Sequence, residues 1–338
     1  MSAVRESVTV IGAGVSGLTC ALRLLEQGRP VRVFADRRTP NTTSDRAGAV
    51  FSPFRIEGHE RAGQWTQRAY SVLSELAERE PAAGVSLTPL RELFFRRLDG
   101  DPWWAEFVRG YERQTTIPAG YADSVRAIVP RMNMRRYMPW LESRVLEFGG
   151  VLVDRRVPDL SSAFATGTQI VVNCSGLGAG TLANDTAVTP MRGQILHVRT
   201  GMSIPECIVE EGSGVRTTYV FPFEDYTVLG GTYERGETIE ATDEAVLRGI
   251  VERCSAMLRA CGYSGVEGLV RERLRDLAGL RPARVVGGVD EAVRLETERI
   301  GDNHWVIHNY GHGRAGVTLS WGCADDVAKR VAEIFEAL

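Results

Sequence analysis

Three glycines near the start of the chain have the spacing of a turn that can hold a pyrophosphate. Residues 12–17 read G-A-G-V-S-G and directly follow a β-branched run at residues 8–11. Gly12 permits a tight turn, Gly14 leaves the backbone bare where a phosphate must approach, and Gly17 lets the following helix pack close to the strand. The N–H groups and positive dipole end of that helix favour an anion without any basic side chain. The contacts expected from this motif are Gly12, Ala13, Gly14, Val15, Ser16 and Gly17.

Regular elements on either side must position this turn. The β-branched run before it predicts a strand, and the apolar residues after it, at helical spacing, predict a helix that ends at Gly28. A second strand at residues 31–34 leads to Asp36, about twenty residues beyond the last glycine, where an acidic side chain hydrogen-bonds an adenosine ribose. This order of elements predicts a Rossmann-type nucleotide-binding fold. The pattern alone leaves NAD and FAD both open.

The segment after Asp36 favours FAD. In an NAD dehydrogenase we expect a prompt return to a helix, whereas here the chain continues through a turn-rich segment full of hydroxyl groups. These hydroxyls can satisfy phosphate oxygens, and the small residues that follow can let backbone N–H groups lie against a flat ring. An ordinary solvated loop is the alternative. The cofactor contacts expected here are Arg37, Arg38, Thr42, Thr43, Ser44, Gly48, Ala49 and Val50.

The bulk composition sets limits on size and partners. A chain of 338 residues exceeds the size at which one hydrophobic core stops growing, so two domains are expected. A formal net charge of −3 without blocks of one sign argues against nucleic acid as a partner. The six cysteines lack metal-ligand spacing and are interpreted as reduced, mostly buried thiols. No apolar run of about twenty residues occurs, so we expect a soluble, cytoplasmic protein without a membrane span.

The middle of the chain predicts a second domain and a return to the first. Residues 54–131 mix amphipathic helical stretches with a tryptophan pair, and no cofactor motif falls there. Short apolar strands at residues 151–153 and 170–172 rejoin the first sheet, so the nucleotide domain is discontinuous. The runs at residues 218–222 and 226–229 predict a hairpin-like pair in an antiparallel sheet that covers the flavin.

The end of the chain predicts a helix, and it raises the question of a metal. Residues 325–338 have apolar positions at helical spacing with charges between them, which is typical of an amphipathic helix packed on the first domain. His308 and His312 lie four residues apart, a spacing that can bind zinc on a helix. The glycines between and after them make a helix improbable, and we expect no metal.

Further segments, spread along nearly the whole chain, carry a second signal. They are residues 35–40, 47–51, 172–176, 192–195, 279–282 and 306–313, the last continuing through Gly316, Thr318, Trp321 and Gly322. In these segments the chain resembles the D-amino acid oxidase family. The resemblance implies an α/β protein, in which a discontinuous Rossmann-type FAD-binding domain joins an α+β substrate domain built on an antiparallel sheet. The implied boundaries are 1–53, 132–190 and 280–338 for the first domain, and 54–131 and 191–279 for the second.

The resemblance also implies an activity and a site. Family members transfer hydride from the α-carbon of a D-amino acid to flavin N5, and O2 reoxidises the flavin to give a 2-oxo acid, ammonia and H2O2; they commonly form dimers. Arg281 and Tyr219 match the anchors of the substrate carboxylate, since a planar guanidinium grips a carboxylate through two parallel hydrogen bonds. A structural ion pair for Arg281 and simple packing for Tyr219 are the alternatives. The other implied cofactor positions are Val157, Ser175, Gly313, Arg314, Ala315, Gly316, Val317 and Thr318.

Three positions depart from relatives. Val215 stands where some members carry an additional lid tyrosine, four residues before Tyr219. Arg314 stands where some members have a glycine whose backbone carbonyl meets the substrate amine; the carbonyl survives, and the position is assigned to the catalytic site. D-aspartate oxidases carry a lid arginine where this chain has Glu210 or Glu211. Neutral or basic D-amino acids are therefore expected to be better substrates than acidic ones.

Four other readings stay open at this point. A D-aspartate oxidase shares the flavin motifs, and a glycine or sarcosine oxidase shares fold, cofactor and hydride chemistry but takes small or N-methylated amines. An NAD-dependent dehydrogenase is disfavoured by the hydroxyl-rich segment and by residues 308–313. A flavin-binding regulatory protein without turnover is disfavoured by Tyr219 and Arg281 together.

Overall fold

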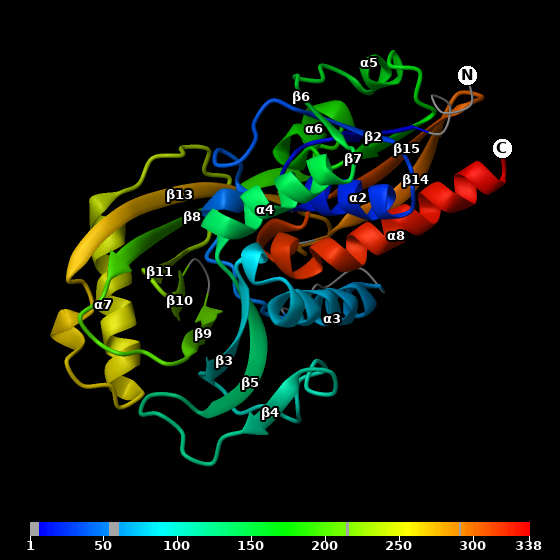
Figure 1. Ribbon diagram of the computed structural model, residues 1–338. Helices are drawn as coiled ribbons and strands as arrows, with labels where there is room; N and C mark the ends of the chain where they lie inside the picture. The colour runs from blue at the N-terminus through cyan, green and yellow to red at the C-terminus, as the bar shows by residue number, and fades with distance from the viewer. Residues whose placement is uncertain (1–6, 54–60, 214–215, 291) are drawn as a thin grey trace.

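The computed structural model describes residues 7–53, 61–213, 216–290 and 292–338, which fold around two sheets (Figure 1). The first sheet has the strand order β14-β15-β7-β1-β2-β6 and is parallel except for the edge strand β14. This arrangement confirms the α/β Rossmann-type fold. Its strands are β1 (Val8–Ile11), β2 (Val31–Ala35), β6 (Val151–Asp154), β7 (Ile170–Asn173), β14 (Arg294–Ile300) and β15 (His304–Tyr310).

Helices cover both faces of this sheet, which explains why its central strands β1 and β7 are buried at every position. On one face Val10, Val33 and Val172 pack in the large core, together with apolar side chains of α2 and α8. On the other face Ile11 and Phe34 pack with side chains of α5. The helices are α2 (Val15–Glu26), α3 (Ala62–Arg79), α4 (Met134–Glu147), α5 (Leu160–Phe164), α6 (Ala179–Leu182), α7 (Glu244–Ala260) and α8 (Gly316–Glu336).

The second sheet has nine strands and is mostly antiparallel, with the order β12-β8-β11-β10-β9-β3-β5-β4 and β13 paired to β8. β10 and β11 form the expected hairpin, closed where the amide of Phe223 donates to the carbonyl of Tyr226. The strands are β3 (Val85–Phe94), β4 (Arg109–Arg113), β5 (Asp123–Met132), β8 (Val188–Arg199), β9 (Cys207–Ser213), β10 (Arg216–Pro222), β11 (Thr227–Thr232), β12 (Glu234–Arg235) and β13 (Glu272–Arg284).

Two expectations about the elements were wrong. Amphipathic helical stretches and no strand were expected within residues 54–131, but their described part holds one long helix, α3, and the three strands β3, β4 and β5. The C-terminal helix was expected from residue 325, yet α8 begins at Gly316. Its first turns are buried nearly all round, so they show no apolar stripe. Gly322 lies in these turns because the backbone of Trp65 in α3 leaves no room for a Cβ atom, which would come within 2.2 Å of the Trp65 oxygen.

The long strands β8 and β13 connect the two halves of the molecule (Figure 1). They pair from Glu272↔Arg199 to Arg284↔Val188, and a single bridge joins Ala283 to His312 beyond the end of β15. Both strands run across boundaries that were expected between the two domains, at 190/191 and 279/280. Residues near the ends of β13 and β15 therefore meet at one place.

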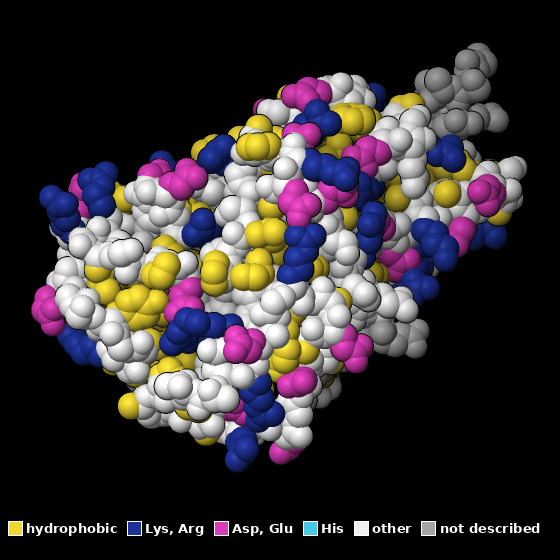
Figure 2. All heavy atoms as spheres, turned by 60° about the horizontal axis from the view of Figure 1, so that its bottom comes forward, with side chains coloured by type: hydrophobic (Ala, Val, Ile, Leu, Met, Phe, Trp, Pro, Cys, Tyr) yellow, Lys and Arg dark blue, Asp and Glu magenta, His cyan; other side chains and the backbone are white. Residues whose placement is uncertain are grey.

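Figure 2 shows one face of the molecule, on which basic and acidic side chains are interspersed. No large area of that face carries charges of one sign only. Within the described ranges, no helix is long and apolar enough to cross a membrane. The six cysteines are free thiols, and all except the half-buried Cys261 are buried, as expected.

Candidate functional site

One large cavity of about 1280 Å³ lies between the carboxyl ends of the first sheet's parallel strands and one face of the second sheet. Gly12 follows β1, Asp36 follows β2, Ser175 follows β7 and Gly313 follows β15. Because these four strands are parallel, the residues that follow them gather at the same sheet edge, where α/β proteins bind ligands. The volume exceeds the roughly 300–1,000 Å³ of a typical small-molecule site. There is room for a dinucleotide and a second, smaller ligand.

The glycine turn has the backbone that its motif predicts. Gly12 adopts a left-handed φ of +105°, and a Cβ atom on it would lie 2.4 Å from the carbonyl oxygen of Cys174. A Cβ atom on Gly17 would lie 1.9 Å from the carbonyl oxygen of Gly12, so Gly17 lets α2 approach the turn. The N-terminus of α2 has no cap from the Gly14 position and no acidic residue in its first turn. It therefore presents an uncompensated positive dipole end to the cavity.

Asp45, which was not among the residues expected from the sequence, holds the hydroxyl-rich segment in its conformation. Thr39 Oγ1 donates to Asp45 Oδ1 over 2.7 Å, and Thr42 Oγ1 donates to Asp45 Oδ2 over 2.6 Å. Ser44 Oγ accepts the backbone N–H of Val15 over 3.0 Å, which ties the segment to the start of α2. Two of the hydroxyls thus organise the loop itself, while Thr42, Thr43 and Ser44 all still border the cavity.

This end of the cavity fits the diphosphate and ribose of a dinucleotide. The bare turn, the helix N-terminus and the carboxylate of Asp36 lie along one wall. Further along, Gly48 lies against the ring of Tyr219, where a Cβ atom would be 3.2 Å from Cε2. The residues present therefore fit FAD, with its phosphates at the turn and its flat ring system toward the second sheet.

At the other end of the cavity, Arg281 and Tyr219 come together from separate strands of the second sheet. Arg281, on β13, donates from Nη1 to the carbonyl oxygen of Thr232 over 3.1 Å. Tyr219, on β10, lies within hydrogen-bonding reach of Arg281. Burial raises the pKa of the Tyr219 phenol, an effect that the positive charge of Arg281 opposes. The phenol therefore keeps its proton near neutral pH and acts as a hydrogen-bond donor.

Glycines make room for these two side chains. A Cβ atom on Gly193 would lie 2.2 Å from the Arg281 guanidinium, and one on Gly230 would lie 2.1 Å from the Tyr219 ring. Phe221 stacks on Tyr219 with the ring centroids 4.5 Å apart. Neither side chain can shift far without meeting backbone or an aromatic ring, so the pair is held in a fixed geometry.

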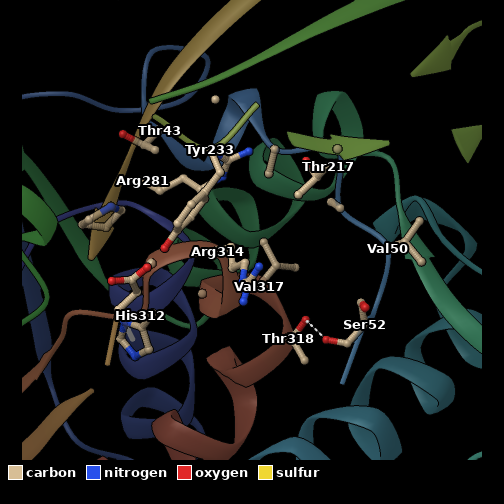
Figure 3. A pocket seen from close by; sticks show the side chains of 18 of the residues that line it. Thr43, Val50, Ser52, Thr217, Tyr233, Arg281, His312, Arg314, Val317 and Thr318 are labelled. Carbon is tan, nitrogen blue, oxygen red and sulfur yellow. Dashed lines mark hydrogen bonds between the residues drawn. The ribbon is translucent and has the colours of Figure 1, made fainter. Parts of the chain in front are cut away.

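The ring of Tyr233 lies between Arg281 and Arg314 (Figure 3). The guanidinium carbon of Arg281 is 5.9 Å from the centroid of the Tyr233 ring, and that of Arg314 is 5.4 Å from it. These are cation–π distances. The Arg314 side chain therefore has room in the site beside Tyr233.

Buried polar groups support the turn that carries Arg314. His312, 3% exposed, bonds through Nε2 to Asn309 Oδ1 over 3.0 Å. Burial lowers the pKa of His312 to about 4, so the ring is neutral at physiological pH. Thr318 donates to the backbone oxygen of Ser52 over 3.4 Å, joining the start of α8 to the loop that holds Gly48 (Figure 3). The two segments expected to flank the ring system are thus tied to each other.

His312 and a second buried histidine, His197, lead to a prediction about acid stability. Burial also lowers the pKa of His197 to about 4, and neither ring nitrogen has a hydrogen-bond partner among the described residues. Since the unfolded chain binds these protons near pH 6.5 and the folded chain only near pH 4, the free energy of unfolding should fall as the pH drops through this window. We expect a loss of roughly 3 kcal/mol per histidine, and the fall should level off below pH 4.

Denaturant unfolding of His197→Phe measures this effect. The substitution removes the unpaired nitrogens but can keep the stacking on Tyr226, whose ring centroid is 4.6 Å away. The variant should be more stable than the unmodified protein by about 1 kcal/mol at pH 7, and its stability should depend less on pH below 6.5. The exposed His304, replaced by Gln, is the control. Coincident profiles for His197→Phe and the unmodified protein would contradict the prediction.

The structure brings most, though not all, of the expected residues to the cavity. Ala315 is fully buried behind it, and Gly17 acts in packing. Arg38 forms an ion pair with Glu142 of α4, next to the neighbouring surface pocket that also contains Asp36. Val157 packs in the core on the α5 face of the first sheet. The expected residues that border the cavity are Gly12, Ala13, Gly14, Val15, Ser16, Asp36, Arg37, Thr42, Thr43, Ser44, Gly48, Ala49, Val50, Ser175, Tyr219, Arg281, Gly313, Arg314, Gly316, Val317 and Thr318.

Other cavity residues were missed by the sequence analysis. Tyr233, on the short connection between β11 and β12, had no motif to mark it. Leu90, Glu92 and Phe94 line the cavity from β3, and their alternation along one strand was the signal that could have found them. Val215 and the side chain of Glu211 lie outside the described residues. Glu210 borders the cavity, and its carboxylate accepts a 2.7 Å hydrogen bond from the Tyr121 hydroxyl.

Comparisons with known proteins identify the family of this chain. A family model described as FAD dependent oxidoreductase (DAO) matches residues 7–330. A D-amino-acid oxidase of Rubrobacter xylanophilus is 39% identical over 321 residues, 94% of each chain. The D-aspartate oxidase of Homo sapiens is 33% identical over 346 residues, 98% of this chain and 96% of that protein.

A solved structure shows the same fold. Glycine oxidase from Geobacillus kaustophilus matches with a TM-score of 0.77 at 18% identity, covering 96% of this chain and 95% of that chain. The match supports the two-sheet architecture and says nothing of the substrate. Because the family model spans nearly the whole chain and the cavity fits a dinucleotide at its glycine turn, the protein belongs to the DAO family of FAD-dependent oxidoreductases.

Proposed function

We propose that this enzyme oxidises D-amino acids, with O2 as the final electron acceptor. The observation that carries the proposal is the pairing of Arg281 with Tyr219, held by glycines in the cavity that also contains the dinucleotide turn. When bound, FAD would accept the hydride that leaves the α-carbon, and O2 would reoxidise it to give H2O2; the imino acid left by loss of the hydride and an amine proton reacts with water to give a 2-oxo acid and ammonia.

The two anchors have complementary tasks. Arg281 offers two parallel N–H donors that grip a carboxylate and fix its plane. The protonated Tyr219 phenol donates a further hydrogen bond to the same carboxylate. With the carboxylate fixed, the α-carbon hydrogen is held over the redox-active ring, and orientation of this kind supplies a large part of the rate enhancement.

The remaining assignments follow from the cavity wall. We assign the N–H groups of the turn at Gly14 and Ser16 to the pyrophosphate, and Asp36 to the ribose. The backbone carbonyl of Arg314 accepts from the substrate amine, which must lose a proton before the α-carbon gives up hydride. We also propose a homodimer, which the family resemblance implies and which analytical ultracentrifugation tests.

A substrate panel tests the proposal. Purified enzyme with FAD should release H2O2 with D-methionine and D-lysine and not with the L-enantiomers. Because Glu210 or Glu211 stands where D-aspartate oxidases carry an arginine, kcat/KM should be higher for D-methionine and D-lysine than for D-aspartate. A clear preference for D-aspartate would refute that order. Activity with glycine or sarcosine but with no larger D-amino acid would instead favour a glycine or sarcosine oxidase.

A further inference from the structure

A carboxylate lies in the wall of the cavity close to the proposed substrate anchors. Glu92, on β3, pairs in register with Val209 of β9, and Val209 pairs with Tyr219 of β10. Residues in register on neighbouring strands point to the same face of a sheet. Glu92, Val209 and Tyr219 therefore form one row that faces the cavity, and all three line it.

The surroundings of Glu92 on this face are apolar. Leu90 and Phe94, two residues before and after it, are 2% and 7% exposed and line the cavity with it, whereas the intervening Arg91 and Leu93 do not. Val209, next in the row, is 9% exposed. A carboxylate set among such side chains is costly unless charged or polar groups approach it. Glu92 already has an interaction partner, but a carboxylate offers about four lone-pair sites, so it can accept from a ligand as well.

The strand register also sets the distance between Glu92 and Tyr219, one of the two residues proposed to bind the substrate carboxylate. Adjacent strands lie about 4.8 Å apart, so the backbone of Glu92 is roughly 10 Å from that of Tyr219. A substrate whose carboxylate is held at Tyr219 and Arg281 reaches Glu92 only with a long side chain. Leu90, Val209 and Phe94 suit an aliphatic stem, and Glu92 suits a cation at its end.

The other charged residues near this wall are either exposed to solvent or bonded to another side chain. Arg96 and Arg97, beyond the end of β3, also border the cavity but are exposed, so solvent and salt screen their charges. Glu210 borders the cavity as well, but it is in register with Leu93 and Thr218, in the row next to that of Glu92, and its carboxylate accepts from Tyr121. Among the described residues of β3 and β9, Glu92 is thus the acidic residue that lies in the same row as Tyr219.

From this arrangement we infer that Glu92 is a specificity residue that binds the terminal cation of basic D-amino acids. The inference rests on the proposed D-amino acid oxidation and narrows its substrate class to D-arginine, D-lysine and similar long cationic substrates. The apolar side chains of Leu90, Val209 and Phe94 alone would accept D-norleucine, whose side chain has the aliphatic carbons of lysine without the charged amine.

The test compares kcat/KM for D-arginine and D-lysine with that for D-norleucine, using enzyme loaded with FAD. The unmodified enzyme should prefer the two cations. In Glu92→Gln the ratio of basic to neutral substrate should fall by about tenfold to a hundredfold, mainly through KM, since one hydrogen bond to a charged group is lost. FAD absorbance and a cooperative melting transition establish that the variant is folded.

Glu112→Gln is the matched control, because it makes the same charge change at an exposed position of β4, on the same sheet but outside the cavity. It should leave the ratio unchanged. A fall of the ratio in Glu210→Gln with none in Glu92→Gln would overturn the inference, as would an unmodified enzyme that oxidises D-norleucine as well as D-arginine. If no D-amino acid is oxidised at all, the proposed function itself has failed.

Discussion

Arg281→Ala is expected to lower kcat/KM for D-amino acids by about a thousandfold, mostly through KM, while the protein still binds FAD. The substitution removes both parallel donors to the substrate carboxylate and leaves that charge without an opposite charge beside it, a loss of roughly 3–5 kcal/mol. Arg281 is on β13 of the second sheet, whereas the glycine turn belongs to the first sheet, so the yellow flavin absorbance should persist. Steady-state kinetics and the bound FAD content measure the two effects separately.

Two further variants test whether the effect on kinetics is specific to the loss of the Arg281 side chain. Tyr219→Phe keeps the ring over Gly230 and removes one hydroxyl donor, so a smaller rise in KM, about tenfold, is expected. Arg275→Ala removes an exposed arginine from the same strand and should behave like the unmodified enzyme. If Arg281→Ala retained normal kinetics, Arg281 would have only the structural role that its bond to the Thr232 carbonyl provides.

Gly17→Ala is expected to cost at least about 3 kcal/mol of folding stability and most of the FAD binding. The new Cβ atom would lie 1.9 Å from the carbonyl oxygen of Gly12 and 2.9 Å from its carbon, and both are backbone atoms that cannot turn aside. Helix α2 would have to move away from the turn, which displaces the N–H groups assigned to the pyrophosphate. Denaturant unfolding with and without FAD, together with FAD content after purification, measures the effect.

The control is a glycine in an open helical position. Gly249, inside α7, would bring a Cβ atom only to 3.4 Å from the flexible end of Arg253. Gly249→Ala should therefore be neutral or stabilise the protein by up to about 1 kcal/mol, because alanine is the better helix former. Should Gly17→Ala behave like Gly249→Ala, the close approach of α2 to the turn would be refuted.

The residues expected to bind the dinucleotide could be predicted from the sequence because they lie close together along the chain. Gly12, Gly14 and Gly17 lie within one turn, and the strands and helix around them have clear periodic patterns. Asp36 follows the next parallel strand, so chain order alone places it at the same sheet edge. The β10–β11 hairpin was predicted for the same reason, since its strands are separated by a short turn.

The errors arose where burial hides the periodic pattern. The first turns of α8 are buried nearly all round, so no apolar stripe indicated a helix before residue 325. The strands β3 to β5 were missed because a bulge interrupts the pairing of β4 with β5 and because Pro89 in β3 and Pro130 in β5 are residues that argue against a strand. Their assignment depends on partners elsewhere in the chain.

By itself the sequence determined the nucleotide-binding turn, the fold class and the family resemblance that singled out Tyr219 and Arg281. Only the tertiary structure decided that these two side chains meet, that Tyr233 separates Arg281 from Arg314, and that Glu92 faces the same cavity. The glycine motif is a property of consecutive residues. The row from Glu92 through Val209 to Tyr219 exists only through the register of three strands far apart in the chain, which no local pattern specifies.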